Sequence, residues 1–160
     1  MQLKHLLDNP VWEALATEDA RLNCGTEVVG YFAEDVSPFV GMKHWDDHDL
    51  AMLEKELPSD RNFSVMIANQ VRIPDCFEVV FTTPLYQMVC TSFHPIFNSS
   101  LIMRSLVKED VPAMLALTSL TKPGPFSQRT IDFGHYIGIV EGNNLLAMAG
   151  ERLHIRATLK

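Results

Sequence analysis

The sequence has no apolar run long enough to span a membrane and no concentration of Lys and Arg. Its 13 basic and 20 acidic residues give a net charge of −7, whereas general nucleic-acid binders need basic stripes that displace counterions from phosphates. Asp8, Pro10 and Glu13 interrupt the first 15 residues, which therefore lack the continuous apolar core of a signal peptide. We expect a cytoplasmic protein that binds neither nucleic acid nor a membrane.

Cysteine is scarce as well. Cys24, Cys76 and Cys90 are odd in number and widely spaced, which argues against a disulfide framework. Their apolar neighbours predict reduced thiols that act as small core residues.

A metal site is not expected either. His44 and His48 are four residues apart with carboxylates between them, a spacing that could present two ligands on a helix. However, His44 should precede the helix, and no third ligand stands nearby. The remaining histidines are isolated in the sequence, and we expect each to be a packed or solvated imidazole: His5, His94, His135 and His154.

What the chain does have is enough apolar sequence for burial, 47% of 160 residues, which suggests one domain or two small halves that share a core. Residues 1–97 hold 15 acids and 6 bases, and residues 98–160 hold 5 acids and 7 bases. The segment across this boundary, "TSFHPIFNSS" at 91–100, has proline and small polar residues without periodicity. We predict two halves, residues 1–95 and 96–160.

The first half should contain helices and strands in alternation. Asn9-Pro10 is a typical helix start, "EVVGYFA" is rich in strand-forming residues, and "DDHDLAMLEKEL" has carboxylates at its beginning and Pro58 after its end. The predicted elements are a helix at 10–21, a strand at 27–33, a helix at 46–57 and three strand-like runs at 63–69, 76–82 and 85–91.

The second half has clearer signals. "LIMRSL" predicts a strand at 101–106, and Glu109 and Asp110 favour a helix start, with Pro112 tolerable in the first turn. Pro123-Gly124-Pro125 ends that helix, and "FSQRTIDF" could form two further turns before Gly134. Gly142-Asn143 is a two-residue turn that joins strands at 136–141 and 144–155. The predicted fold class is α+β, with a mixed or antiparallel sheet and helices in each half.

Several segments of the sequence resemble, in their order along the chain, the opening half of an acetyltransferase of the GNAT superfamily. They are "RSLVKEDVPAMLALTSLTKPGPF" and "TIDFGHYIGIVEGNNLLAMAGERL", which supply a β-α-α-β-β order of elements. "LDNPVWEAL" and "PLYQMVC" resemble the amino-terminal extension of bacterial members, so the likeness runs from about Leu7 to Ile155.

The resemblance implies acetyl transfer from acetyl-CoA to a small-molecule or peptide amine. In the superfamily a loop of the form Q/R-x-x-G-x-G/A holds the cofactor's pyrophosphate, and these 160 residues contain no such loop. We therefore expect this chain to be incomplete or inactive as an acetyltransferase and to bind little or no acetyl-CoA, and we assign no cofactor-binding or catalytic residue.

The resemblance also suggests substrate-binding positions. The connection between the first two helices of the superfamily often shapes the acceptor pocket, which makes Phe126 and Arg129 candidates, and Glu151 is the acid nearest to the expected acetyl position. The alternatives are that Phe126 fills an apolar gap, that Arg129 is an ordinary surface charge and that Glu151 is a solvated charge near the end of a strand. As an alternative function, the chain is a non-catalytic interaction protein whose unpaired strand at 144–155 forms a homodimer or meets a completing subunit.

Overall fold

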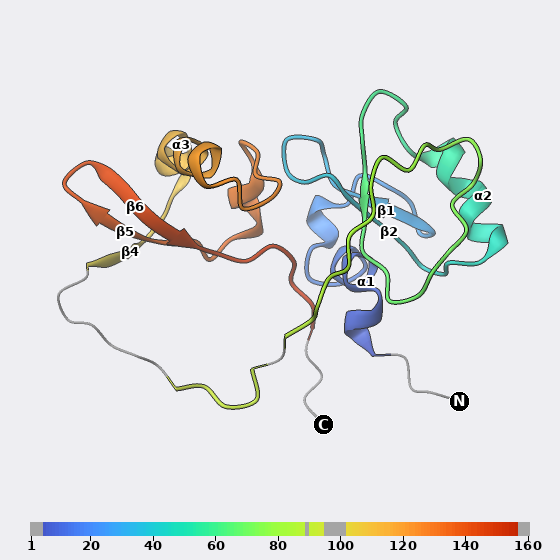
Figure 1. Ribbon diagram of the computed structural model, residues 1–160, viewed down its shortest axis with the longest axis horizontal. Coiled ribbons are helices and arrows are strands. Elements are labelled where there is room, and N and C mark those ends of the chain that lie inside the picture. The colour runs from blue at the N-terminus through green and yellow to red at the C-terminus, as the bar shows by residue number, and fades with distance from the viewer. Residues whose placement is uncertain (1–4, 89, 95–101, 157–160) are drawn as a thin grey trace.

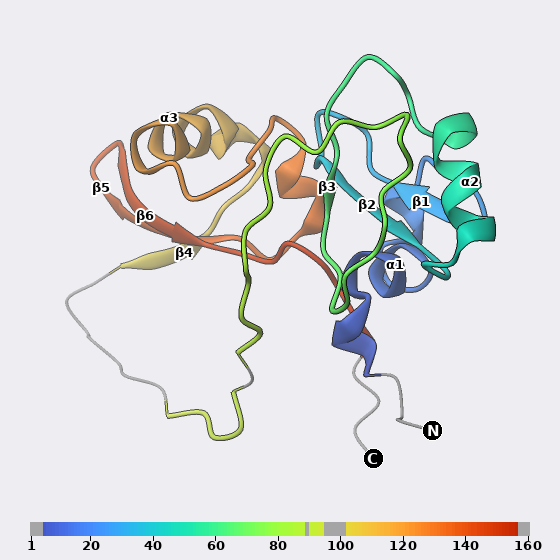
Figure 2. The ribbon, with the colours of Figure 1, turned by 45° about the vertical axis from the view of Figure 1, so that its right-hand side comes forward.

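The computed structural model describes residues 5–88, 90–94 and 102–156, and within them the chain forms two three-stranded sheets that share no strand. Figures 1 and 2 show these sheets side by side, each with helices packed against it. This arrangement confirms the α+β fold class. In the first half the elements are η1 (Leu6–Asp8), α1 (Pro10–Leu15), η2 (Ala20–Leu22), β1 (Val29–Tyr31), β2 (Phe39–Met42), α2 (Asp47–Glu56) and β3 (Ser64–Val65).

The first sheet has the order β1-β2-β3, with an antiparallel and a parallel pair. Helix α1 lies so close to β2 that a Cβ on Gly41 would be 2.5 Å from the backbone nitrogen of Trp12. On α2, Leu50 and Leu53 pack into a cluster with strand residues Val29 and Val40. The predicted helix at 46–57 is confirmed, and Asp46 caps it by accepting a hydrogen bond from the Asp49 amide.

The second sheet is antiparallel, in the order β4-β5-β6. Helix α3 covers one face of it, where Met114 packs with Leu106 and Tyr136 (Figure 1). Gly142 has a φ of 59°, which is the left-handed conformation that the predicted hairpin turn needs. The elements are β4 (Met103–Ser105), η3 (Lys108–Asp110), α3 (Val111–Thr121), η4 (Thr130–Phe133), β5 (Ile137–Glu141) and β6 (Asn144–Ala149).

The first predicted helix is shorter than expected and ends at Leu15 instead of residue 21. The hydroxyl of Thr17 donates to the carbonyl of Glu13, which the Thr17 amide would use in a continuing helix. That amide and the amide of Asp19 both donate to the Ala14 carbonyl instead, so the chain turns tightly. A short 3-10 helix, η2, follows.

The strand prediction for residues 63–91 is largely wrong. Only Ser64–Val65 forms a strand there, and the described residues of the runs at 76–82 and 85–91 do not, although they are apolar. Phe81, Tyr86 and Met88 are exposed, and β-forming side chains make a strand only beside a partner strand. Strand β2 was not predicted, because "FVGM" is short and follows directly after Pro38.

Two details of the second half also differ from the prediction. The second helix of the β-α-α-β-β order is a single 3-10 helix, η4, and the last strand ends at Ala149 instead of residue 155. Ala149 pairs with Ile137, the first residue of β5, and the ring of Tyr136 packs on the next residue, Gly150, where a Cβ would lie 2.2 Å from Tyr136 Cδ1. Glu151 therefore lies beyond the strand.

The three cysteines are not core residues, which corrects the prediction made from their neighbours. Cys24, Cys76 and Cys90 are free and exposed. Among the described residues, no helix has the length and apolar character needed to cross a bilayer. The predicted joint at 91–100 lies mostly outside the described residues.

The two halves meet around Phe133, the last residue of η4. Its side chain is 2% exposed and packs into a cluster whose other buried members all come from the first half: Val11, Leu15, Leu22, Phe32 and Val36. Leu153 of the second half packs against this cluster. The rings of Phe133 and Phe32 lie edge to face, with centroids 5.1 Å apart. One turn of the second half therefore completes the core of the first half.

Candidate functional site

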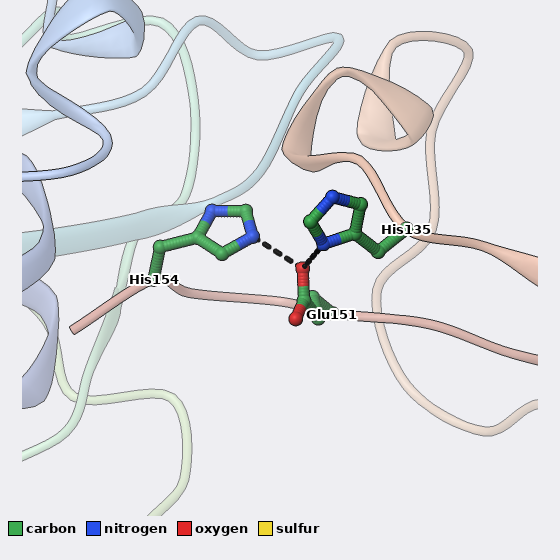
Figure 3. Close-up of side chains that lie close together, drawn as sticks. All are labelled: His135, Glu151 and His154. Atoms are coloured by element: carbon green, nitrogen blue, oxygen red, sulfur yellow. Dashed lines mark hydrogen bonds and ion pairs between the residues drawn. The ribbon is translucent and has the colours of Figure 1, made fainter. Parts of the chain in front are cut away.

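Three chemically active side chains meet at the junction of the two halves. Figure 3 shows the rings of His135 and His154 directed at the carboxylate of Glu151 from opposite sides. The distance from His135 Nδ1 to Glu151 Oε2 is 2.8 Å, and His154 Nε2 is hydrogen-bonded to the same oxygen. The three ligand-type atoms all lie within 4.8 Å of one another.

The backbone places these side chains in two ways. Gly134 and His135 have φ values of 95° and 51°, so two consecutive residues turn the chain between η4 and β5. A histidine in the left-handed region is uncommon and mildly strained. After β6, the hydroxyl of Tyr136 donates to the Glu151 carbonyl over 3.0 Å, which fixes the start of the segment that carries Glu151 and His154.

Asp19 anchors His154 from the first half. Its side chain is 0% exposed, and both of its oxygens are used: the His154 amide donates to Oδ2 over 2.8 Å, and Nδ1 of the ring lies 2.7 Å from Oδ1. The tight turn that shortens the first helix is what brings this carboxylate to the junction. Since Asp19 holds Nδ1, the other ring nitrogen of His154 is left to face Glu151.

The charges of this group stabilise one another. The hydrogen bond with Asp19 raises the pKa of His154, against the effect of partial burial, and Glu151 raises it further. The hydrogen bond from His154 lowers the pKa of Glu151, so this carboxylate is ionised at neutral pH. The group borders an open pocket of about 520 Å³ lined by Glu18, Arg21, Glu151, Leu153, His154, Ile155 and Arg156.

A second open pocket, of about 600 Å³, lies between α3 and the turn before β2. It is lined by Glu34, Asp35, Leu115, Ser127 and Gln128. The pocket thus combines two carboxylates, an apolar side chain and neutral hydrogen-bonding groups. Two contacts hold its walls together: the Arg129 amide donates to the Asp35 carbonyl over 2.7 Å, and the Thr130 hydroxyl donates to the Val36 carbonyl over 2.8 Å.

The substrate positions suggested by the resemblance are not gathered in one place. Phe126 is half-buried, with its ring edge to face against Tyr136 at 5.9 Å. Arg129 forms ion pairs with Asp132 at 2.9 Å and Asp35 at 3.4 Å. Glu151 stands apart from both, in the histidine group. Ser127 and Gln128, which lie between Phe126 and Arg129 in the sequence, line the second pocket. The substrate roles of Phe126, Arg129 and Glu151 stay predictions.

The sequence reading missed the grouping of His135 with His154, which were expected to be isolated. The spacing of three between Glu151 and His154 is the one visible signal. Nothing in the sequence indicates that a turn 16 residues earlier brings a second imidazole to the same oxygen. His44 and His48 were the two histidines with the spacing of metal ligands. In the structure His44 precedes α2, and both side chains are exposed.

The helix starts of the described chain carry negative charge. Helix α2 begins with Asp46, Asp47 and Asp49. Helix α3 follows Glu109 and Asp110, and has Pro112 in its first turn. Helix α1 begins at a proline, which has no N–H, and has Glu13 in its first turn. These ends therefore do not offer the free N–H groups and positive potential that bind an anion.

The chain is similar to a protein from Novosphingobium aromaticivorans DSM 12444 whose crystal structure is assigned to an acetyltransferase of the GNAT family. The two structures superpose with a TM-score of 0.81 and 30% sequence identity, over 94% of this chain. The matched region spans 66% of the length of that protein. No model of a known protein family matches the sequence, and no curated protein matches it.

Proposed function

Because this chain belongs to the GNAT superfamily, we propose that it takes part in the transfer of an acetyl group from acetyl-CoA to an amine. The observation that supports this function is the structural similarity to a GNAT acetyltransferase over 94% of the chain. Within the chain, we assign the acceptor side of the reaction to the pocket between residues 34–35 and 127–128.

The composition of this pocket fits a cationic amine. Glu34 provides negative charge, while that of Asp35 is shared with Arg129. Leu115 provides an apolar wall, and Ser127 and Gln128 can accept or donate hydrogen bonds. The pocket also lies beside the connection after α3, where the resemblance places the acceptor. In this proposal Phe126 supports that connection by packing on Tyr136, and Arg129 positions Asp35.

Acetyl-CoA itself does not fit the described residues. Its pyrophosphate needs a cluster of free backbone N–H groups, commonly at a helix start, and all three α-helices begin with acids or a proline. We therefore assign none of the described residues to the binding of acetyl-CoA. In the proposed enzyme the cofactor is held by other residues of the same polypeptide or by a completing subunit.

Amine binding can be tested directly, without turnover. Isotope-labelled protein is titrated with a lysine-containing peptide, a linear diamine and an arylalkylamine, and amide shifts are followed by NMR. We expect saturable shifts at Ser127 and Gln128 with at least one amine and none with the matching alcohol. Glu34→Gln should weaken binding by a factor of about 1.4 to 5, because an exposed ion pair contributes about 0.2–1 kcal/mol.

Glu27→Gln is the matched control, because Glu27 is also exposed in the first half but lies outside the pocket. Equal effects of the two variants, or amine-induced shifts confined to other residues, would remove the support for this acceptor pocket. Calorimetry with acetyl-CoA is a separate measurement, and we expect no saturable binding below millimolar concentration. Micromolar binding would contradict our reading of the helix starts.

The alternative is a binding protein without turnover. Strand β6 is the edge of its sheet within the described residues, and Leu146 on it is 53% exposed. Exposed edges of this kind pair readily with a second strand, and two copies could join through Asn144–Ala149. Sedimentation velocity at micromolar concentration should then show a dimer that Leu146→Lys dissociates. A monomer at all concentrations would exclude this alternative.

A further inference from the structure

We propose that His135, Glu151 and His154 form a binding site for a divalent transition-metal cation such as Zn²⁺. This site goes beyond the proposed acetyl transfer and is lined by different residues from the amine pocket. The ligands would be Nδ1 of His135, one carboxylate oxygen of Glu151 and Nε2 of His154.

The ligand set selects the class of metal. Two imidazoles and one carboxylate suit zinc and its neighbours in the first transition row, whereas Mg²⁺ and Ca²⁺ prefer oxygen ligands alone. Three protein ligands leave the fourth tetrahedral position open to water or another molecule. The open pocket beside Glu151 and His154 gives access to that position.

The geometry needs only small adjustments. Zinc bonds of about 2.0–2.2 Å place tetrahedral ligand atoms roughly 3.3–3.6 Å apart. The His135 nitrogen is 2.8 Å from the Glu151 oxygen, and all three atoms lie within 4.8 Å of one another. The side chain of His135 is 82% exposed, so its ring can rotate without disturbing the core. Figure 3 shows that both rings already present nitrogen atoms to the carboxylate.

The surroundings of His154 are the strongest support. Metal-binding histidines commonly donate their second ring N–H to a carboxylate, which fixes the tautomer and the ring orientation. Asp19 is fully buried and occupies Nδ1 of His154 at 2.7 Å. Without a metal ion both ring nitrogens of His154 face carboxylate oxygens, Nδ1 that of Asp19 and Nε2 that of Glu151. A cation bound between Nε2 and Glu151 would replace the proton of Nε2 and leave the Nδ1–H bond to Asp19 in place.

The test is metal binding by the full 160-residue chain. Protein is treated with a chelator, exchanged into chelator-free buffer and titrated with ZnCl₂ by calorimetry. We expect one ion per chain with a dissociation constant in the micromolar range or tighter. Titration with Co²⁺ should give the visible absorption of a tetrahedral site that contains nitrogen ligands.

The variants separate this site from adventitious binding. His135→Ala and Glu151→Gln each remove a ligand and should weaken Zn²⁺ binding by at least about tenfold. Asp19→Asn keeps all three ligands and should weaken it about 10–100-fold, the usual effect of losing such a partner. His48→Ala is the matched control, an exposed histidine on α2 that should leave the affinity unchanged.

His135 is exposed, so His135→Ala should fold normally even if Asp19→Asn does not, and circular dichroism verifies this. Zinc binding that His135→Ala leaves unchanged would overturn the proposal, as would the absence of saturable heat below millimolar Zn²⁺. In either case a proton, and no metal ion, joins His154 to Glu151.

Discussion

Removal of the Phe133 side chain should destabilise both halves of the protein, although only the second half contains the substitution. The ring is 2% exposed and contacts apolar residues of the first half. Burial of an aromatic side chain removes about 150–250 Å² from water. At about 25 cal/mol per Å² this is about 4–6 kcal/mol, and compactness of the unfolded chain reduces the figure by about 10–40%.

The contact with Phe32 adds a smaller amount. Its edge-to-face geometry at 5.1 Å is typical of pairs that contribute about 0.5–1.5 kcal/mol. Together with the cavity left behind, these figures place the loss for Phe133→Ala at about 3–5 kcal/mol. A domain of ordinary stability, about 5–15 kcal/mol, would lose a large part of its free energy of unfolding.

Urea unfolding followed by tryptophan fluorescence measures this effect in the first half, because Trp12 and Trp45 both lie there. Phe81→Ala is the control, since its ring is exposed and its loss should change stability by less than about 0.5 kcal/mol. Circular dichroism on the same samples reports both halves. If Phe133→Ala lost no more than Phe81→Ala, or left the tryptophan transition unchanged, the shared core would be refuted.

Two further substitutions test contacts that the fold depends on. Asp110 accepts hydrogen bonds from Arg104 at 2.6 and 2.7 Å and from the Val107 amide, which lower its pKa to about 2 from 3.8. Its contribution to stability is therefore present above pH 3.8 and is lost as the pH falls towards 2. Asp110→Asn should lower the free energy of unfolding by about 1 kcal/mol at pH 7, a figure reduced for solvent screening. The urea midpoints of the variant and the wild type should converge near pH 2. A constant difference between the two midpoints from pH 7 to pH 2 would contradict this role of Asp110. Thr130→Val leaves the buried Val36 carbonyl without its hydrogen-bond donor and should lower the free energy of unfolding in urea by about 1–3 kcal/mol. The control Thr121→Val, at the exposed end of α3, should lower it by less than about 0.5 kcal/mol. Equal losses in the two variants would show that the buried hydrogen bond contributes little.

The parts of the fold that depend on neighbouring residues were predictable from the sequence. The turn at Gly142 requires a left-handed residue, and α2 has its acids, its cap and its stop within a dozen positions. The GNAT resemblance, which rests on several such local segments in the right order, was confirmed by the structural similarity. By contrast, β2 could not be predicted, since its four residues form a strand only between β1 and β3.

The candidate site was harder to predict because its parts come from distant segments. The Asp19 contact with His154 joins residues 135 positions apart, and neither belongs to a recognisable motif. The apolar run at 76–82 shows the opposite error: its composition favours a strand, but the structure gives it no partner. In both cases the decisive contact is tertiary, and a pattern read along the chain does not contain it.

The contact between Asp19 and His154 also orders events during synthesis. Ribosomes add about 5–20 residues per second, so the 135 positions between the two residues correspond to roughly 7–27 seconds of translation. Throughout that interval Asp19 lacks His154, the residue that meets both of its carboxylate oxygens in the folded chain. The amino-terminal half of the nascent chain is thus made early, but it reaches its final form only when residues 151–156 emerge.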